Sequence, residues 1–321
     1  MASVSIIIVS WNAREPLGRC LASLSACPHE VIVVDNASAD GSAGHVASRF
    51  PGVALVEAPM NLGFAGAINL GSRHASGEFL LVLSSDVAPH PGAIDTLMAF
   101  LDIHRKHGAV AGRLEAESGR TRPGWSFRRF PTFGSLAVRL LLIDKLWPRN
   151  PATRYYHALD IDQSRVTDVE QPPAACLMLR RAAFESVGRM DEAFYPAWFE
   201  DVDLCRRLRA KGWRVAFHPS AVFTRIAPDT KRQLTHDAFT RLWYRNLQRY
   251  ARKHHGLAGD LFVKLLILVG MGLRMLICVL RRDRAGFRAF RRVSFDVFSP
   301  SRFTRLMDQL SEQASGSVKG L

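Results

Sequence analysis

The sequence predicts an α/β fold with a mostly parallel central sheet and helices on both of its faces. Four short apolar runs, the first of them rich in β-branched residues, alternate with segments of helical apolar spacing, at intervals of about 25 residues. Polar residues that include carboxylates come directly after the first, second and fourth runs. Ligands bind at the carboxyl ends of the strands in such sheets, so the sequence also predicts which edge holds a site.

The expected strands and helices follow one another along the first half of the chain. VSIIIV at 4–9 has the composition of a strand that is buried on both faces, and helical spacing follows it at 16–24. Further strands are expected at 31–34, 53–56 and 79–83, and further helices at 43–50, 63–74 and 91–104.

The second half of the chain has a less regular pattern. Residues 113–170 carry few strand signals, and we expect long loops there with one helix near 133–142. A helix is expected at 200–211, because acids fill its first turn and basic residues its last, and Gly212 follows it. Short strands are expected at 176–179, 215–218 and 221–224.

Two carboxylates directly follow buried strands. Asp35 is placed to accept hydrogen bonds from a nucleotide base or ribose, although Asp-Asn-Ala-Ser is also good turn chemistry. Asp86 is placed to hold a divalent cation against a diphosphate, because hard oxygen ligands suit magnesium or manganese. A turn or helix cap before Pro91 is the structural alternative for Asp86.

Two further segments combine polar groups with a helix start. NLGFAGA at 61–67 opens a helix with two glycines, which suits a phosphate, but the pattern alone favours close packing of the helix on the sheet. Glu200, Asp201 and Asp203 follow Trp198 at the start of another helix. Aromatic surroundings can raise the pKa of a carboxyl group towards the range of a general base, whereas interaction with the helix dipole is the alternative.

In order and spacing, these segments resemble the family 2 glycosyltransferases, most closely their bacterial rhamnosyltransferase-like branch. The resemblance covers about residues 3–225 and rests on five segments. These are VSWN at 9–12, VDNASADGS at 34–42, NLGFAGAIN at 61–69, DEAF at 191–194, and FEDVDLC at 199–205 with Gly212-Trp213 after it. It implies a GT-A nucleotide-diphospho-sugar transferase fold and an inverting single displacement.

The resemblance and the residue chemistry together give each candidate a role. We expect Asp201 to be the catalytic base, with Glu200 beside it, and Asp86 to be the metal ligand. We expect Trp198 and Asp203 to bind the acceptor. The expected nucleotide-sugar-binding residues are Ser10, Asn12, Asp35, Ser38, Asn61, Gly63, Ser85 and Arg225.

The chain departs from the family pattern at the expected metal site. SSD at 84–86 stands where this branch often has Asn-Pro-Asp, and Thr224 stands where the family usually has a histidine that supports the metal. Mg²⁺ or Mn²⁺ is the expected cofactor, but Asp86 without that histidine would hold it weakly. Arg225 could instead offset the charge of the diphosphate directly.

The net charge of +14 is concentrated late in the chain. Residues 241–305 contain 15 Lys and Arg against three acids, whereas residues 1–240 contain 27 against 24. Within this basic block, 261–280 has 16 apolar residues, which favours an anionic membrane over nucleic acid. Because both flanks are basic, a helix in the membrane interface or a shallow hairpin is expected, with a buried core helix as the alternative.

The sequence therefore predicts a GT-A domain at 1–235 and a helical membrane-associating segment at 236–321. We expect a nucleotide-diphospho-sugar donor, with rhamnose as the best choice of sugar, and a lipid-linked or cell-surface glycan acceptor. Five cysteines, an odd number, suit a reducing compartment, and the expected location is the cytoplasmic face of a bacterial inner membrane, peripheral or monotopic. A catalytically degenerate nucleotide-sugar-binding protein and a nucleic-acid-binding protein are the alternatives.

Overall fold

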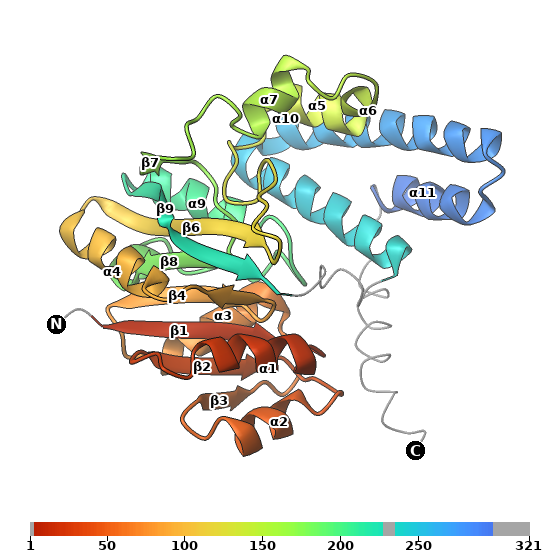
Figure 1. Cartoon of the computed structure of the whole chain (residues 1–321). Coiled ribbons are helices and arrows are strands. Elements are labelled where there is room, and N and C mark those ends of the chain that lie inside the picture. Colours follow the sequence, from red (N-terminus) through yellow and green to blue (C-terminus); the bar gives the residue numbers. More distant parts are fainter. Residues whose placement is uncertain (1–2, 227–234, 298–321) are drawn as a thin grey trace. The chain divides into compact units, whose positions relative to one another are not determined.

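The computed structural model describes residues 3–226 and 235–297 (Figure 1). The chain divides into two compact units. The first contains Met1–Phe130 and His157–Thr230, and the second contains Pro131–Tyr156 and Lys231–Leu321. The segment Pro131–Tyr156 therefore belongs with the C-terminal helices, although the sequence interpretation placed it in the first domain.

A mixed sheet forms the first unit. Its order in the described residues is β3-β2-β1-β4-β8-β6-β9-β5, with β7 paired to β9. The pairs β1–β2, β1–β4, β2–β3 and β6–β9 are parallel, whereas β8 is antiparallel to both β4 and β6. The edge strands β5 and β7 are antiparallel to β9. The predicted parallel arrangement therefore holds for β3-β2-β1-β4, and the sheet as a whole is mixed. The strands are β1 (Val4–Ser10), β2 (Glu30–Asp35), β3 (Ala54–Glu57), β4 (Phe79–Ser84), β5 (Val87–Pro89), β6 (His107–Ala116), β7 (Thr167–Asp168), β8 (Cys176–Arg180) and β9 (Arg214–Arg225).

Helices cover both faces of this sheet. Alternate residues of β1 enter different cores, because Ile6 and Ile8 pack on one face and Ile7 on the other. Each fully buried aliphatic side chain of this kind contributes about 1.5–3 kcal/mol. The first face is covered by α1 (Arg14–Ser23), α2 (Ser42–Arg49) and α4 (Ala93–Ile103), and the second by α3 (Gly63–His74), α8 (Arg181–Ser186) and α9 (Glu200–Ala210).

Two strands differ from the sequence interpretation. β6 begins before the stretch that was expected to be loops, and it pairs along its length with β9. The two short strands expected at 215–218 and 221–224 are one strand, β9, with a bulge at Pro219. His218 pairs with Gly112 and Val222 with the next residue, so the bulge accommodates a proline that cannot donate to the sheet.

Helices make up the second unit. α5 (Phe133–Leu140) confirms the helix expected near 133–142, and α6 (Ile143–Leu146) and α7 (Pro151–Tyr156) follow it. The two C-terminal helices are α10 (His236–Leu280) and α11 (Arg284–Asp296). α10 is kinked at Gly256, whose φ is 66° and ψ is −162°. By length and composition alone, Asp237–Leu280 is the one helix among the described residues that could cross a membrane.

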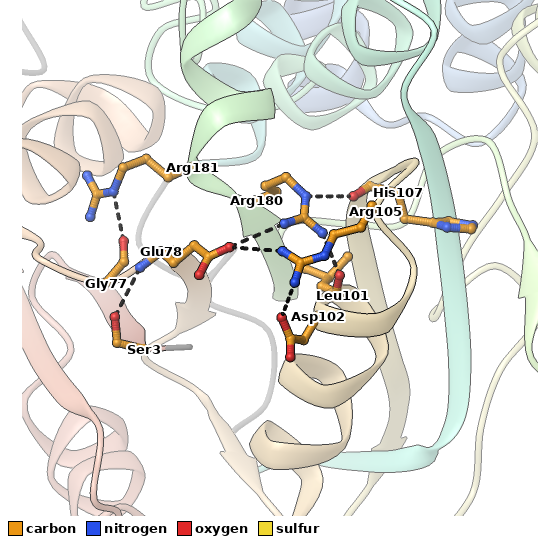
Figure 2. Close-up of polar contacts among 9 residues, drawn as sticks. All are labelled: Ser3, Gly77, Glu78, Leu101, Asp102, Arg105, His107, Arg180 and Arg181. Carbon is orange, nitrogen blue, oxygen red and sulfur yellow. Dashed lines mark hydrogen bonds and ion pairs between the residues drawn. The ribbon is translucent and has the colours of Figure 1, made fainter. Parts of the chain in front are cut away.

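Two consecutive arginines fix the end of β8 (Figure 2). Arg180 is buried and donates to the carbonyl oxygens of Leu101 and His107, and it also pairs with Glu78. Arg181 donates to three carbonyl oxygens at and beyond the end of α3, those of Ser72, Ala75 and Gly77. These bonds satisfy carbonyl groups that a helix leaves unpaired at its C-terminus.

Replacing Arg180 with methionine should lower the free energy of unfolding by about 2–4 kcal/mol, because buried carbonyl groups lose their donor. Urea unfolding followed by circular dichroism measures this loss. Arg105→Met is the matched control, since Arg105 also pairs with Glu78 but its side chain is 67% exposed. The control should cost less than about 0.5 kcal/mol. Equal losses in the two variants would contradict this role of Arg180.

Candidate active site

The polar residues that follow the strands meet at one edge of the sheet. Ser10 ends β1 and is paired in register with Asp35, which ends β2. Ser84 ends β4 and is paired with Val9. Because these three strands are parallel, their carboxyl ends lie side by side, and the loops that follow them share one edge.

The loops after β1 and β2 are tied together by side chains from both. The backbone amide of Asn12 donates to Ser38 Oγ at 2.9 Å, and Asn12 Oδ1 accepts from the amide of Ala39 at 2.7 Å. Asp35 Oδ2 accepts from the amide of Ser38 at 2.9 Å. The structure therefore brings together Asn12, Asp35 and Ser38, three of the predicted nucleotide-binding residues.

Several buried polar atoms at this edge are left without a partner. Within the described residues, Ser10 Oγ, Trp11 Nε1 and Asp35 Oδ1 have no hydrogen-bond partner. Asp35 is only 4% exposed, so water does not compensate it freely. Unpaired buried polar atoms are rare and costly, which makes a ligand with matching donors and acceptors a natural partner for this edge.

Asn61 and Gly63 lie beside the same edge, and Asn36 connects them. Asn36 Nδ2 donates to Asn61 Oδ1 at 3.0 Å, and the amide of Gly63 donates to the same oxygen at 2.8 Å. Gly63 has a φ of 71°, and a Cβ there would lie 2.9 Å from the carbonyl oxygen of Pro196. Close packing therefore explains Gly63. The sequence interpretation gave no role to Asn36, whose contacts come from residues far away in the chain.

Asp86 forms a buried ion pair. Its side chain is fully buried, and Arg225 Nη1 lies 2.6 Å from Oδ2 while the Ser84 hydroxyl donates to Oδ1. Ser85 is buried in the same turn. The pairing joins the end of β4 to the end of β9, so the predicted metal ligand and the predicted diphosphate-binding arginine do lie together.

These residues do not fit a metal site. Both oxygens of Asp86 are already engaged, and a cation there would have to displace Arg225. Thr224, at the position of the family histidine, instead lies 2.8 Å from His90 Nε2. Across residues 3–226 and 235–297, His, Cys, Asp and Glu side chains form no group of three or more arranged to hold a metal ion.

A strained turn places the acidic cluster at the start of α9. Trp198 and Phe199 have φ values of 76° and 73°, a left-handed conformation that costs about 1–3 kcal/mol for each non-glycine residue. Trp198 is half-buried, and Glu200 and Asp201 follow it as the first residues of α9. Such strain is typical of functional sites, where the surrounding structure must hold the chain in place.

Burial raises the pKa of both leading carboxyl groups in α9. The pKa of Glu200 is well above its ordinary value because of burial first and the neighbouring Asp201 second, and its Oε2 has no partner within the described residues. The pKa of Asp201 is also raised by burial, which outweighs hydrogen bonds from the backbone and the nearby charge of Arg128. The sequence interpretation gave no role to Arg128.

Asp203 occupies a different environment from Asp201. Its side chain has no exposed surface, and Arg207 Nε lies 2.7 Å from its Oδ2 one turn later in α9. These contacts place Asp203 inside the protein, whereas the prediction had it touching an acceptor. Its packing supports the helix that carries Asp201.

The start of β8 connects Asp201 with the edge described above. Ser84 donates its backbone amide to the carbonyl oxygen of Ala175 at 2.9 Å, and the backbone of Ala174 lies near enough to Asp201 to lower its pKa. Because β8 is antiparallel to β4, its first residues lie at the carboxyl end of β4. The carboxylates Asp35, Asp86 and Asp201 therefore share one edge of the sheet.

Residues 5–187 match the family described as Glycosyl transferase family 2, which is more than half of the chain. The chain belongs to glycosyl transferase family 2. It is therefore a glycosyltransferase. Residues 153–294 also match Glycosyl transferase family group 2.

Two curated relatives of this glycosyltransferase come from Mycobacterium tuberculosis. The chain is 32% identical over 234 residues to an N-acetylglucosaminyl-diphospho-decaprenol L-rhamnosyltransferase, which covers 67% of this chain and 73% of the relative. It is 29% identical over 245 residues to a pre-mycofactocin glycosyltransferase, which covers 72% of this chain and 43% of that relative.

Solved structures support the predicted GT-A fold. The mannosyltransferase PcManGT from Pyrobaculum calidifontis, solved with GDP-Man and Mn²⁺, is similar with a TM-score of 0.54 and 17% identity. The similarity covers 97% of this chain and 85% of that one. TarS of S. aureus is similar with a TM-score of 0.51 and 15% identity, over 91% of this chain and 90% of that one.

The raised pKa of Glu200 should make the stability of this glycosyltransferase depend on pH. A carboxyl group whose pKa is higher in the folded than in the unfolded state stabilises the folded protein at pH values below its unfolded-state pKa, about 4.3. This contribution to the free energy of unfolding is lost as the pH rises through the folded-state pKa. Glu200→Gln should therefore flatten the fall in unfolding free energy above about pH 4.3, when urea unfolding is measured at a series of pH values. The exposed control Glu57→Gln should leave the fall unchanged. A pH profile of Glu200→Gln parallel to the wild type would contradict the assignment.

Proposed function

We propose that this glycosyltransferase moves a sugar, L-rhamnose, from a nucleotide-diphosphate donor to a hydroxyl group of a lipid-linked glycan. The observation that carries the proposal is the meeting of Asp35, Asp86 and Asp201 at one edge of a sheet of this family. The choice of rhamnose, from a dTDP donor, and of a lipid-linked acceptor is supported by the relative that the chain matches at 32% identity.

Donor binding is assigned to the loops after β1 and β2. Asp35 Oδ1 and Ser10 Oγ are buried acceptor and donor groups without a partner in the described residues, which a nucleoside can pair. Asn12 and Ser38 hold the two loops against each other. The base and ribose would therefore lie over β1 and β2, with the diphosphate directed towards Asp86 and Arg225.

Proton removal is assigned to Asp201. The acceptor hydroxyl gives its proton to the Asp201 carboxylate while its oxygen attacks the anomeric carbon, and the bond from that carbon to the diphosphate oxygen breaks. This single displacement inverts the anomeric configuration. Burial raises the pKa of Asp201, which makes its carboxylate a stronger base than an exposed one. Glu200 is buried beside the base, and the charge of Asp201 helps to raise the pKa of Glu200, which favours the neutral form of that group.

Arg225 is assigned the role of binding the departing diphosphate. A guanidinium group carries five N–H donors, so it can keep Asp86 and still donate to a phosphate oxygen. Its side chain is 23% exposed, so a ligand can reach it. A fixed positive charge at this point stabilises the negative charge that develops on the leaving group.

Membrane association is supported by the surface of α10. One face of the helix is buried within the second unit, including Val263, Ile267 and Met271. The apolar stripe on the other face is exposed and consists of Leu257, Leu261, Leu265, Val269, Leu273, Leu276 and Leu280. A helix with one face packed on protein and one exposed apolar face suits the membrane interface. The nucleic-acid alternative gives no reason for such a stripe.

The two charges within the apolar segment of α10 point away from this stripe. Lys264 pairs with Asp260 at 3.0 Å, and Arg274 Nη1 donates to the carbonyl oxygen of Leu140 at 2.6 Å. Both contacts lie within the second unit. The stripe is therefore free of charge along its length, which favours an interfacial helix on the cytoplasmic face of the membrane.

Asp201→Asn should lower the turnover number by about 10²–10⁴-fold and leave donor affinity nearly unchanged, because only the proton acceptor is lost. Turnover of dTDP-rhamnose with a lipid-linked acceptor and calorimetric titration of the donor measure the two quantities. Asp102→Asn, at an exposed carboxylate on α4, is the control. A wild-type protein that binds donor without turnover would instead be the degenerate binder.

Arg225→Gln should weaken donor binding by about 10–100-fold, because a charge-assisted bond to the diphosphate is lost. Arg225→Lys should lose less, since it keeps the charge but not the planar donor group. Arg214→Gln, at the exposed other end of β9, is the control. Wild-type turnover should persist in excess chelator. Turnover that chelator abolishes and Mn²⁺ restores would reject the role given to Arg225.

A further inference from the structure

A cavity of about 820 Å³ lies at the turn that joins α10 to α11. It belongs to the second unit, and none of its residues takes part in the active site proposed above. Three arginines, one acid and apolar groups form its wall: Cys278, Val279, Arg282, Asp283, Arg284, Phe287 and Arg288.

The turn that builds this cavity is tight. Asp283 caps α11 by accepting from the amide of Gly286 at 2.9 Å. A Cβ on Gly286 would lie 2.3 Å from Asp283 Oδ2 and 3.0 Å from Cys278 Sγ, so a larger residue would have to displace the capping side chain. Arg282 has a φ of 55°, which reverses the chain before the cap. The turn therefore places the exposed arginines Arg282, Arg284 and Arg288 close together along the chain.

Arginine side chains cluster at the start of α11, where the helix dipole disfavours positive charge. Arg284 is the first residue of α11, and Arg288 lies one turn later. The N-terminus of a helix carries partial positive charge, so cations in its first turn are unfavourable. Within the described residues, Arg282, Arg284 and Arg288 have no ion-pair partner. Three arginines stand against one carboxylate, Asp283, so the wall carries net positive charge and attracts an anion.

The surroundings of the cavity distinguish a lipid anion from a soluble one. Val279 and Phe287 contribute apolar groups to the same wall as the arginines. The apolar stripe of α10 ends at this point, with Leu276 58% and Leu280 76% exposed. An anionic group bound here would have an uncharged apolar surface beside it, which suits a phosphate ester attached to a hydrocarbon chain.

We propose that this cavity binds the phosphate group of a membrane lipid. The guanidinium groups of Arg282, Arg284 and Arg288 donate to the phosphate oxygens, and the hydrocarbon chain lies along the apolar stripe. The inference rests on the proposed membrane association and extends it to a defined headgroup site. It concerns the second unit and does not depend on the catalytic roles given to residues of the first.

Binding of the full-length protein to vesicles tests the proposal. The cavity variant Arg284→Gln/Arg288→Gln is compared with a matched control, Arg281→Gln/Arg291→Gln, which removes two exposed charges outside the cavity wall. Flotation is measured with phosphatidylcholine vesicles alone, with added phosphatidylglycerol, and with added polyprenyl phosphate at equal charge. With either anionic lipid, the cavity variant should bind about tenfold more weakly than the control.

The outcomes separate the sources of the phosphate. Similar affinity for both anionic lipids supports a general headgroup site, and tighter binding of polyprenyl phosphate supports a site for the acceptor lipid. Equal losses in the cavity and control variants would overturn the proposal, as would equally strong competition by free glycerol phosphate. Leu265→Glu/Leu276→Glu tests membrane association itself. If that variant still binds all vesicles, the proposed association fails independently of the cavity.

Discussion

The register of the parallel strands is the constraint on which the rest of the molecule depends. Ser10 lies beside Asp35 and Val9 beside Ser84, so three loops that carry polar side chains must leave the sheet at one edge. β8 runs in the opposite direction, and its first residues therefore return to that same edge. The backbone of Ala174, just before β8, lies near enough to Asp201 to lower its pKa, which places the start of α9 by that edge. A shift of one residue in any of these pairs would turn the alternate side chains to the wrong face.

The edge of the sheet that carries these carboxylates also contains groups that lower the stability of the fold. Glu200 is buried without a partner for Oε2 in the described residues, and two consecutive residues before it, Trp198 and Phe199, have a left-handed backbone. Asp35 Oδ1 is likewise unpaired. By contrast, at the opposite end of the sheet Arg180 and Arg181 donate to carbonyl groups of two helices, those of Leu101 in α4 and Ser72 in α3. The hydrogen bonds of the two arginines stabilise the fold, whereas the strained and unpaired groups lie where a ligand can supply their partners.

Local patterns were enough for many of the elements but not for the contacts between them. Runs such as VSIIIV are recognisable strands because β-branched residues fit a sheet buried on both faces. β6, with the sequence HGAVAGRLEA, was missed because its Ala and Gly residues lack that signal, and Pro219 made one strand look like two. The ion pair of Asp86 with Arg225 joins residues 139 positions apart, and no periodicity predicts it. The sequence analysis gave no role to Asn36 and Arg128 for the same reason, since their contacts at the site come from residues far away in the chain.

Hydropathy alone could not decide what the apolar segment at 261–280 does, because a core helix and an interfacial helix have the same average composition. The distribution of burial does distinguish them. In a core helix the whole circumference is covered, and in a spanning helix it is apolar all round. Here Ile267 is fully buried, Leu265 is 58% exposed, and both Lys264 and Arg274 bond to groups of the second unit. Lys264 and Arg274 are therefore on the side that packs on protein, and the exposed side of the segment is apolar.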